Sequence, residues 1–228
     1  MLHHIRPHRI FRLHETASYG ERLVQLVLPD DRTPQLLETA VLVSLARACG
    51  VRRYFEFGCL HGIQTLNLAA NLPAGARVFT LDLDEPAFAA AHHVPADRAI
   101  AARRLRAASA PAFVGTRFED RVTTLFGDSN HFDFGPYGGS MDMVYVDGGH
   151  DLRTLASDTR NALAMLADRP LACVVWHDYG NPVYPHLTDF LDAAAEDSDL
   201  YHVEETMLCI YLHDAPARIR DALTRKAA

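Results

Sequence analysis

The sequence is almost without lysine: Lys226 is the only one among its 22 basic residues, and the others are arginines. A Schiff-base lysine or a catalytic ammonium is therefore excluded from the body of the chain. Positive charge is also in deficit, because 29 acidic residues give a net charge of −7 at pH 7. This is the wrong sign for a protein that wraps a phosphate backbone, so nucleic acid is not an expected partner.

Long apolar runs and paired cysteines are missing as well. No run reaches the roughly 18 residues that a membrane span needs, and the basic N-terminus MLHHIRPHRIFRLHE contains no apolar signal segment. We expect no membrane partner and a cytoplasmic protein with reduced thiols, since the cysteines are far apart and form no CxxC pair. The cysteines are Cys49, Cys59, Cys173 and Cys209.

What is present is an ordinary globular composition, with 49% hydrophobic residues in 228, and an alternation of helical and strand patterns from residue 34 onward. We expect an α/β fold of the doubly wound, Rossmann-like type. Its mostly parallel sheet would have seven strands, with an antiparallel C-terminal edge strand. The predicted strands are 52–57, 76–83, 121–126, 141–146, 171–176, 200–205 and 207–213.

The chain divides into three parts on this interpretation. Residues 34–213 form the one large domain, and residues 214–228 form a C-terminal tail. Residues 1–33 form an extension, rich in histidine and arginine, that acts as a substrate lid or as a solvated tail.

Polar residues follow the first two predicted strands, where open α/β sheets bind ligands. Glu56 ends the first strand, Gly58 lets the backbone approach a ligand, and Gly62 begins a helix whose amides face the pocket. A carboxylate here repels the pyrophosphate of a dinucleotide but favours the sulfonium and ammonium groups of S-adenosylmethionine. Asp82 ends the second strand, where a carboxylate can accept hydrogen bonds from both ribose hydroxyls.

Two later strands end in a second polar group. Asp147 and His150 follow the strand at 141–146, and His177 and Asp178 follow the strand at 171–176. Parallel strands can bring these ends together, so two carboxylates and two imidazoles would share one pocket. Such a set indicates either a divalent metal site or a device for proton transfer.

Five segments, in order along the chain, resemble motifs of the class I S-adenosylmethionine-dependent methyltransferases: EFGCLHGIQT, VFTLDLDE, RVTTLFGDS, MDMVYVDGGH and VVWHDY. The chain is most similar to the branch that methylates hydroxyls of sugars and other small natural products, akin to macrocin O-methyltransferase and more distantly to catechol O-methyltransferase. The resemblance implies that Glu56 and Gly58 contact the methionine part of the cofactor and that Asp82 contacts its ribose. It places Asp128 and Ser129 beside adenine.

The same resemblance implies roles for the second polar group. Metal-dependent members hold a magnesium-type ion at the positions of Asp147, His177 and Asp178, and that ion acidifies the acceptor hydroxyl. Here the chain departs from the family, because His177 replaces an acidic residue and suits manganese, iron or zinc better than magnesium. His150 stands where relatives place a lysine or histidine base, and its ordinary pKa suits proton abstraction near neutral pH.

These expectations amount to a methyltransferase that acts on a hydroxyl of a small polar acceptor, with His150 as base and a divalent metal as a second cofactor. Three alternatives stay open: a metal-independent N- or O-methyltransferase, an NAD-dependent oxidoreductase on a similar sheet, and a cofactor-binding protein without catalysis. The sequence leaves the oligomeric state open, and a homodimer is the first candidate because dimers are the commonest soluble oligomers.

Overall fold

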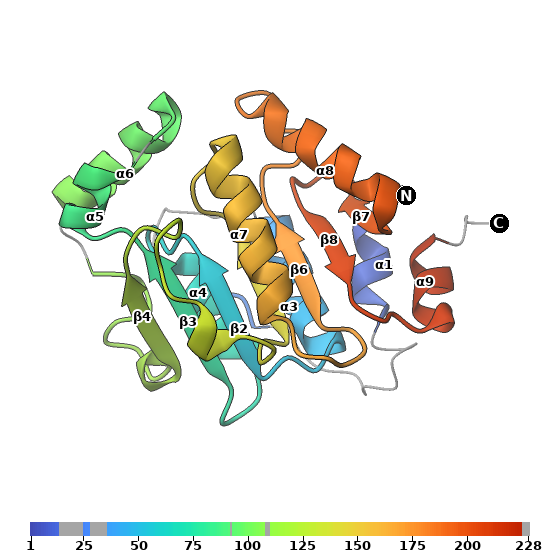
Figure 1. Ribbon diagram of the computed structural model, residues 1–228. Helices are drawn as coiled ribbons and strands as arrows, with labels where there is room; N and C mark the ends of the chain where they lie inside the picture. The colour runs from blue at the N-terminus through green and yellow to red at the C-terminus, as the bar shows by residue number, and fades with distance from the viewer. Residues whose placement is uncertain (14–24, 28–35, 92, 108–109, 225–228) are drawn as a thin grey trace.

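One continuous sheet organises the molecule (Figure 1). The computed structural model describes residues 1–13, 25–27, 36–91, 93–107 and 110–224. Within these residues the sheet has eight strands in the order β1-β7-β8-β6-β5-β2-β3-β4, and among them only β8 runs antiparallel to its neighbours. The strands are β1 (Leu2–Ile5), β2 (Arg53–Phe57), β3 (Arg77–Asp82), β4 (Val122–Phe126), β5 (Met143–Val146), β6 (Cys173–Trp176), β7 (Leu200–Val203) and β8 (Cys209–Leu212).

The α/β, mostly parallel fold and the antiparallel C-terminal strand are confirmed, with two differences in detail. The sheet has eight strands rather than seven, because β1 comes from the predicted extension and pairs in parallel with β7. The antiparallel β8 lies between β7 and β6, so β1 and not β8 forms that edge. β1 is only four residues long and two of them are His3 and His4, so its apolar pattern was too short to predict a strand. The rest of the predicted division into 1–33, 34–213 and 214–228 stays a prediction, and residues 14–24 and 28–35 lie outside the described residues.

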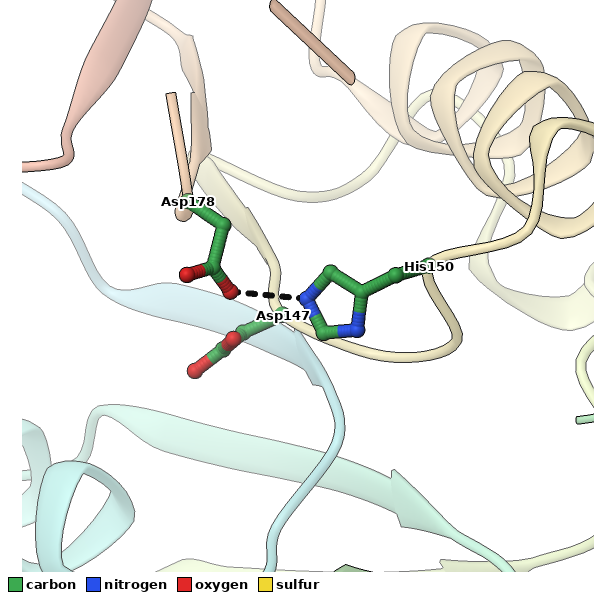
Figure 2. A group of neighbouring side chains, drawn as sticks. All are labelled: Asp147, His150 and Asp178. Atoms are coloured by element: carbon green, nitrogen blue, oxygen red, sulfur yellow. Dashed lines mark hydrogen bonds and ion pairs between the residues drawn. The ribbon is translucent and has the colours of Figure 1, made fainter. Parts of the chain in front are cut away.

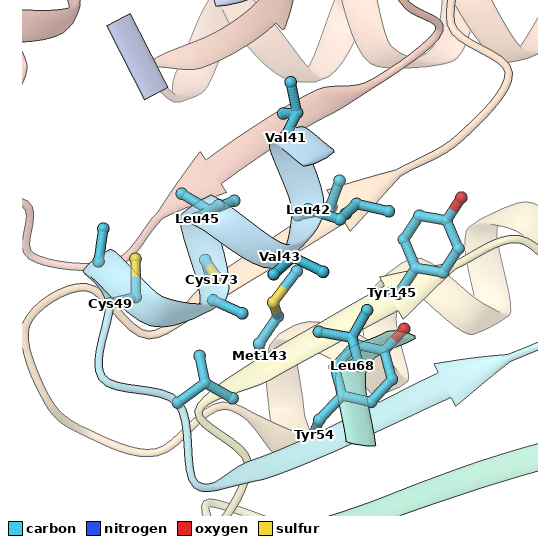
Figure 3. Close-up of a cluster of buried hydrophobic side chains, with 14 of the residues drawn as sticks. Val41, Leu42, Val43, Leu45, Cys49, Tyr54, Leu68, Met143, Tyr145 and Cys173 are labelled. Carbon is cyan, nitrogen blue, oxygen red and sulfur yellow. The ribbon is translucent and has the colours of Figure 1, made fainter. Parts of the chain in front are cut away.

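Helices cover both faces of the sheet, as the crossovers between parallel strands require (Figure 1). Alternate residues of each strand pack on opposite faces: Met143 and Tyr145 of β5 join one core, whereas Val144 and Val146 join the other. Figure 3 shows the first core, where α3 packs over β2 and β5. The helices are α1 (Pro7–Phe11), α3 (Leu36–Ala48), α4 (Ile63–Asn71), α5 (Glu85–Ala90), α6 (Pro95–Ala107), α7 (Leu152–Met165), α8 (Pro185–Asp197) and α9 (Ala217–Thr224).

The strand order fixes where a ligand can bind. From β2 the chain builds outward through β3 and β4, and it then returns to build the other half through β5 and β6. This reversal between β2 and β5 is a topological switch point, and ligands of open α/β sheets bind there, beyond the carboxyl ends of the strands. The residues that follow β2, β3, β5 and β6 therefore meet at one edge of the sheet.

Buried cysteines, a tryptophan contact and a helix cap complete the description of the fold. All four cysteines are free and buried. Trp176 is a core residue whose indole N–H donates to Thr159 at 2.9 Å. Asp84 caps α5 by accepting a hydrogen bond from the Ala87 amide at 2.8 Å. In the described part of the chain, no helix has the length and apolar character needed to cross a membrane.

Candidate active site

The loop after β2 is shaped by two glycines with positive φ. Gly58 has φ +86°, and a Cβ atom built on it would lie 2.1 Å from the Asp147 carbonyl oxygen. Only glycine lets this loop lie against the loop that follows β5. Gly62, at φ +69°, precedes α4 as its N-cap, with Pro111 and Phe113 packed beside it. The loop that sequence reasoning assigned to the cofactor is therefore in direct contact with the loop assigned to the acceptor.

Glu56 lies under this loop and is almost fully buried. Its carboxylate accepts hydrogen bonds from the Thr65 hydroxyl of α4, at 3.0 and 3.2 Å to the two oxygens. Burial raises the pKa of Glu56 well above its ordinary value, against the lowering effect of the Thr65 hydrogen bond. The ionised form of a carboxylate in this environment is strongly stabilised by a cationic ligand group nearby, because the opposite charge offsets the hydration that burial removes.

Asp82 stands at the end of β3, beside the glycine loop. It accepts hydrogen bonds from the amide of Leu60 at 2.9 Å and from that of Leu83 at 2.7 Å. The bond to Leu60 crosses from β3 to the loop after β2, so this carboxylate ties the loop to the end of β3. Leu60 itself adopts positive φ, at 48°, which is uncommon for a leucine and shows how sharply the loop bends.

Asp128 and Ser129 follow β4, at the far end of the same edge. Asp128 accepts hydrogen bonds from the amide and side chain of Asn130, at 2.9 and 3.1 Å, and lies 3.1 Å from His131 Nδ1. Burial opposes ionisation of Asp128, but the donors from Asn130 and His131 outweigh it and lower its pKa. Asp128 therefore shapes a turn, and Asn130 ties that turn to α7 through the Thr154 hydroxyl at 2.8 Å.

His177 follows β6 and lies among three carboxylates. Its Nε2 is 3.0 Å from Glu38 Oε2, and its buried Nδ1 is 3.1 Å from Asp178 and 3.3 Å from Asp147. Within the described residues, Nδ1 makes no hydrogen bond of good geometry with either of these two. Burial opposes protonation of this ring, but the Asp147 charge and the other carboxylates outweigh it, so the pKa of His177 is raised well above its ordinary value.

His150 follows β5 and faces a carboxylate at each ring nitrogen. Nε2 lies 2.7 Å from Asp178 Oδ2, the contact drawn in Figure 2, and Nδ1 lies 2.9 Å from Asp97 Oδ1. Burial lowers the pKa of His150, but the hydrogen bonds to Asp178 and Asp97 outweigh burial and raise it to about 10. Asp178 has φ +63°, and two histidines and Asn181 hold its pKa far below its usual range despite burial.

The two strand ends converge as the sequence predicts. Ligand-capable atoms of Asp147, His150 and Asp178 all lie within 4.8 Å of one another (Figure 2). His177 joins them through Nδ1. This Nδ1 is buried between two carboxylates and makes no hydrogen bond of good geometry within the described residues, so it is suited to bind a metal ion. Its Nε2 contact with Glu38 suits the outer carboxylate that usually orients such a ligand. The donor set Asp147, His177 and Asp178 thus fits a divalent cation, with one nitrogen and two carboxylates.

Two carboxylates of this cluster escaped sequence reasoning. Glu38 comes from the first turn of α3, and Asp97 comes from the first turn of α6. Both look like ordinary acidic residues near a helix N-terminus, where the helix dipole alone explains them. Neither follows a strand, so only the folded chain brings them to the site.

A hollow of about 420 Å³ adjoins the cluster on the side of Glu38. It lies between the start of α3 and the turn that joins β7 to β8. Glu38 connects it to the cluster, because one carboxylate oxygen contacts His177 and the other accepts a hydrogen bond from the Met207 amide at 2.6 Å. The residues that line it are Leu36, Leu37, Glu38, Glu205, Thr206 and Met207.

Comparison with known proteins gives a family for this arrangement. The family model of a methyltransferase domain matches residues 55–179, which is more than half of the chain and includes the carboxyl ends of β2, β3, β4, β5 and β6. A search of curated proteins gave no match. Many solved structures share the fold.

Three of these structures illustrate the likeness. An O-methyltransferase from Bacillus cereus, in complex with SAH, has a TM-score of 0.52 and 18% identity over 90% of this chain and 91% of that chain. The SAH-bound methyltransferase PaMTH1 from Podospora anserina has a TM-score of 0.54 and 16% identity, covering 88% and 86% of the two chains. The O-methyltransferase TomG from Streptomyces achromogenes, involved in tomaymycin synthesis and solved with SAM, has a TM-score of 0.50 and 20% identity, covering 90% and 88%.

At these identities the structures establish the fold, and the family model establishes the family. The resemblance to the class I S-adenosylmethionine-dependent methyltransferases is confirmed. The chain belongs to the methyltransferase-domain family and is a methyltransferase.

Proposed function

We propose that this methyltransferase transfers the methyl group of S-adenosylmethionine to a hydroxyl of a small polar acceptor, such as a sugar or a hydroxylated secondary metabolite. The observation that carries the proposal is the cluster of imidazoles and carboxylates around His150, in direct contact with the glycine loop through Gly58 and Asp147. A methyl acceptor that must lose a proton needs such a base beside the sulfonium. The O-methyltransferases among the structural relatives support the choice of oxygen as the acceptor atom.

The cofactor would occupy the ends of β2, β3 and β4. Glu56 and the loop at Gly58 and Gly62 would bind the methionine part, because a buried carboxylate favours its ammonium group. Asp82 would accept hydrogen bonds from the ribose hydroxyls. Asp128 and Ser129 would lie beside adenine, with the turn held by Asn130.

His150 would act as the general base. The acceptor oxygen attacks the methyl carbon in line with the sulfonium, the carbon–sulfur bond breaks with its electron pair left on sulfur, and the hydroxyl proton passes to Nε2 of His150. Products are the methyl ether, S-adenosylhomocysteine and protonated imidazole. Nε2 is the suitable nitrogen because it faces Asp178 and the cluster, whereas Nδ1 is turned to Asp97.

Asp147, His177 and Asp178 would hold a divalent cation, with Glu38 orienting His177 from behind. Such a cation supplies positive charge that lowers the pKa of an acceptor hydroxyl and of the neighbouring imidazole. The imidazoles of His150 and His177 lie against the same carboxylates, and these carboxylates raise the pKa of both rings, so the position favours positive charge and supports a cation there. His150 is left out of this set because a nitrogen bound to metal cannot also accept a proton.

Transfer of labelled methyl groups tests the proposal. The parent protein is incubated with methyl-labelled S-adenosylmethionine, Mn²⁺ and three hydroxyl probes: 3,4-dihydroxybenzoate, methyl glucoside and N-acetylglucosamine. We expect ether product from at least one probe, and we expect His150→Ala to slow it by about 100-fold or more while S-adenosylhomocysteine still binds. His213→Ala, in a half-exposed His–Asp group that follows β8, is the matched control and keeps the parent rate.

Two outcomes contradict the proposal separately. Transfer to none of the three probes by protein that binds the cofactor contradicts the hydroxyl acceptor. Transfer by His150→Ala at the parent rate contradicts the assignment of the base.

A further inference from the structure

Asp97 reaches the site from α6 and holds His150 by two separate contacts. Its Oδ1 lies 2.9 Å from His150 Nδ1, and its Oδ2 accepts a hydrogen bond from the His150 backbone amide at 2.8 Å. Both side chains are largely buried, with 12% of each exposed. A carboxylate that contacts both the ring and the backbone amide of one residue restricts the conformation of that residue far more than a single surface ion pair does.

Tyr184, at the start of α8, also restricts the His150 side chain. Its ring stacks on the imidazole with centroids 4.0 Å apart and an angle of 9° between the planes. Its hydroxyl donates to Asp97 Oδ1 at 2.8 Å. The imidazole is therefore fixed in its plane by Tyr184 and in its rotation by Asp97. The remaining ring nitrogen, Nε2, is directed at Asp178 and the cluster.

This geometry selects one form of the imidazole. The Tyr184 hydroxyl and the His150 amide both donate to Asp97, so both carboxylate oxygens act as acceptors. The Nδ1 atom beside Oδ1 must then carry a hydrogen. A neutral ring with this hydrogen has its lone pair on Nε2, on the side of the reacting atoms, once Nε2 gives up its contact with Asp178 Oδ2 to the acceptor hydroxyl. The same relation of an orienting carboxylate to a base exists in serine hydrolases on unrelated folds.

We propose that Asp97 is a positioning residue for methyl transfer, which acts through His150 by keeping the hydrogen on Nδ1 and Nε2 free for the acceptor hydroxyl. The inference rests on the proposed function, in which His150 is the base, and extends it to α6. It gives this helix a part in the reaction, although its sequence is otherwise an alanine- and arginine-rich surface helix.

Asp97→Asn is the informative substitution because it keeps the shape of the side chain. An amide has one acceptor and one donor end, so it cannot satisfy both the His150 backbone amide and an N–H at Nδ1. We expect kcat for the best of the three hydroxyl probes to fall about 100-fold, with KM and S-adenosylhomocysteine affinity unchanged. Asp84→Asn, at the N-cap of the neighbouring helix α5, is the matched control and leaves kcat unchanged.

A double-mutant cycle separates positioning from a structural role. If Asp97 acts through His150, then adding Asp97→Asn to His150→Ala causes no further loss of kcat. A full additional loss in the His150→Ala background shows that Asp97 merely supports the fold, and it overturns the inference. Tyr184→Phe gives a second route if Asp97→Asn does not fold: it keeps the stacked ring, and we expect a loss of about 3- to 10-fold in kcat that also depends on His150. Parent kcat in Tyr184→Phe would then overturn the inference.

The failure of this inference is distinct from that of the proposed function. A slow His150→Ala together with Asp97→Asn at the parent rate leaves the base assignment intact and removes only the role of Asp97. A His150→Ala variant at the parent rate removes both.

Discussion

The two halves of the site use carboxylates in opposite ways. At the ends of β2 and β3, Glu56 and Asp82 accept hydrogen bonds from uncharged groups: a threonine hydroxyl and two backbone amides. At the ends of β5 and β6, Asp147 and Asp178 lie against imidazoles. The pKa of Glu56 is accordingly raised by burial, whereas the pKa of Asp178 is held low by its donors in spite of burial.

This contrast determines what each half can bind. A buried carboxylate with uncharged donors keeps a need for positive charge, which a cationic cofactor can meet. An ionised carboxylate that accepts a hydrogen bond from an imidazole is already compensated, and it can exchange that compensation for a metal ion or stabilise a ring that takes up a proton. The first half is suited to holding a charged ligand still, and the second is suited to moving a proton.

The largest expected effect comes from the second half. Asp147→Asn removes a carboxylate of the proposed cation site, and we expect methyl transfer to fall about 100-fold or more. Treatment of the parent with a chelator should have a similar effect, reversed by Mn²⁺. Asp168→Asn, in the exposed group with His213, is the matched control and keeps the parent rate. Full activity of the chelated parent would mean that the imidazoles alone balance the charge of the carboxylates in this half of the site.

The next largest effect is expected at Gly58, where the two halves are in contact. Gly58→Ala places a Cβ 2.1 Å from the Asp147 carbonyl oxygen, and it also strains a residue at φ +86°. We expect the free energy of unfolding in urea to fall by about 3 kcal/mol or more. Gly75→Ala has nearly the same φ, +81°, with open space around it, so it should cost only about 1 kcal/mol. Equal losses in the two variants would show that the halves do not depend on this contact.

The first half is tested by cofactor affinity. Asp82→Ala removes the acceptor proposed for the ribose hydroxyls, and we expect S-adenosylhomocysteine to bind about 10- to 100-fold more weakly in calorimetric titration. Asp84→Ala, two residues along the chain, removes only the cap of α5 and should lower stability by about 1 kcal/mol without weakening binding. Equal affinity in Asp82→Ala and the parent would contradict the ribose assignment.

The smallest expected effect concerns Asp158 of α7, which is fully buried against Gly148 in the loop after β5. A Cβ on Gly148 would lie 3.2 Å from its Oδ2. Burial raises the pKa of Asp158 to about 7. Because the native value exceeds the unfolded value of about 3.9, the native state loses stability as pH rises between these values. Asp158→Asn has no ionisable group at this position, so its native state does not lose stability in this way as pH rises.

We therefore expect the stability of Asp158→Asn relative to the parent to increase from pH 4 to about pH 7, by at least about 1 kcal/mol, and to level off above. Urea unfolding at several pH values measures it. The exposed Asp189→Asn on α8 is the control and should show no such trend. A difference that is independent of pH would contradict the account of Asp158.

The halves also differ in how far the sequence predicts them. Strand ends carry most of the site, and these follow from local pattern: alternating and continuous apolar runs place Glu56, Asp82, Asp147 and Asp178 at one edge of a parallel sheet. The eighth strand and the position of β8 depend on pairing between distant segments, which apolar pattern alone does not specify.

The partners of the histidines were unpredictable for a similar reason. Glu38 and Asp97 are separated from His177 and His150 by long stretches of chain, and each sits in a helix whose own pattern explains it. Their roles exist only through tertiary contacts. A sequence that places one residue beside a strand end indicates a site, but it does not indicate which helix supplies the counter-charge.

The ligand at the ends of β2 and β3 decides what the rest of the site can do. Calorimetric titration of the parent protein with S-adenosylhomocysteine and, separately, with NAD tests it directly. The uncharged donors around Glu56 and Asp82 predict saturable binding of S-adenosylhomocysteine and none of NAD, whose pyrophosphate these carboxylates repel. Binding of NAD without binding of S-adenosylhomocysteine would contradict the account.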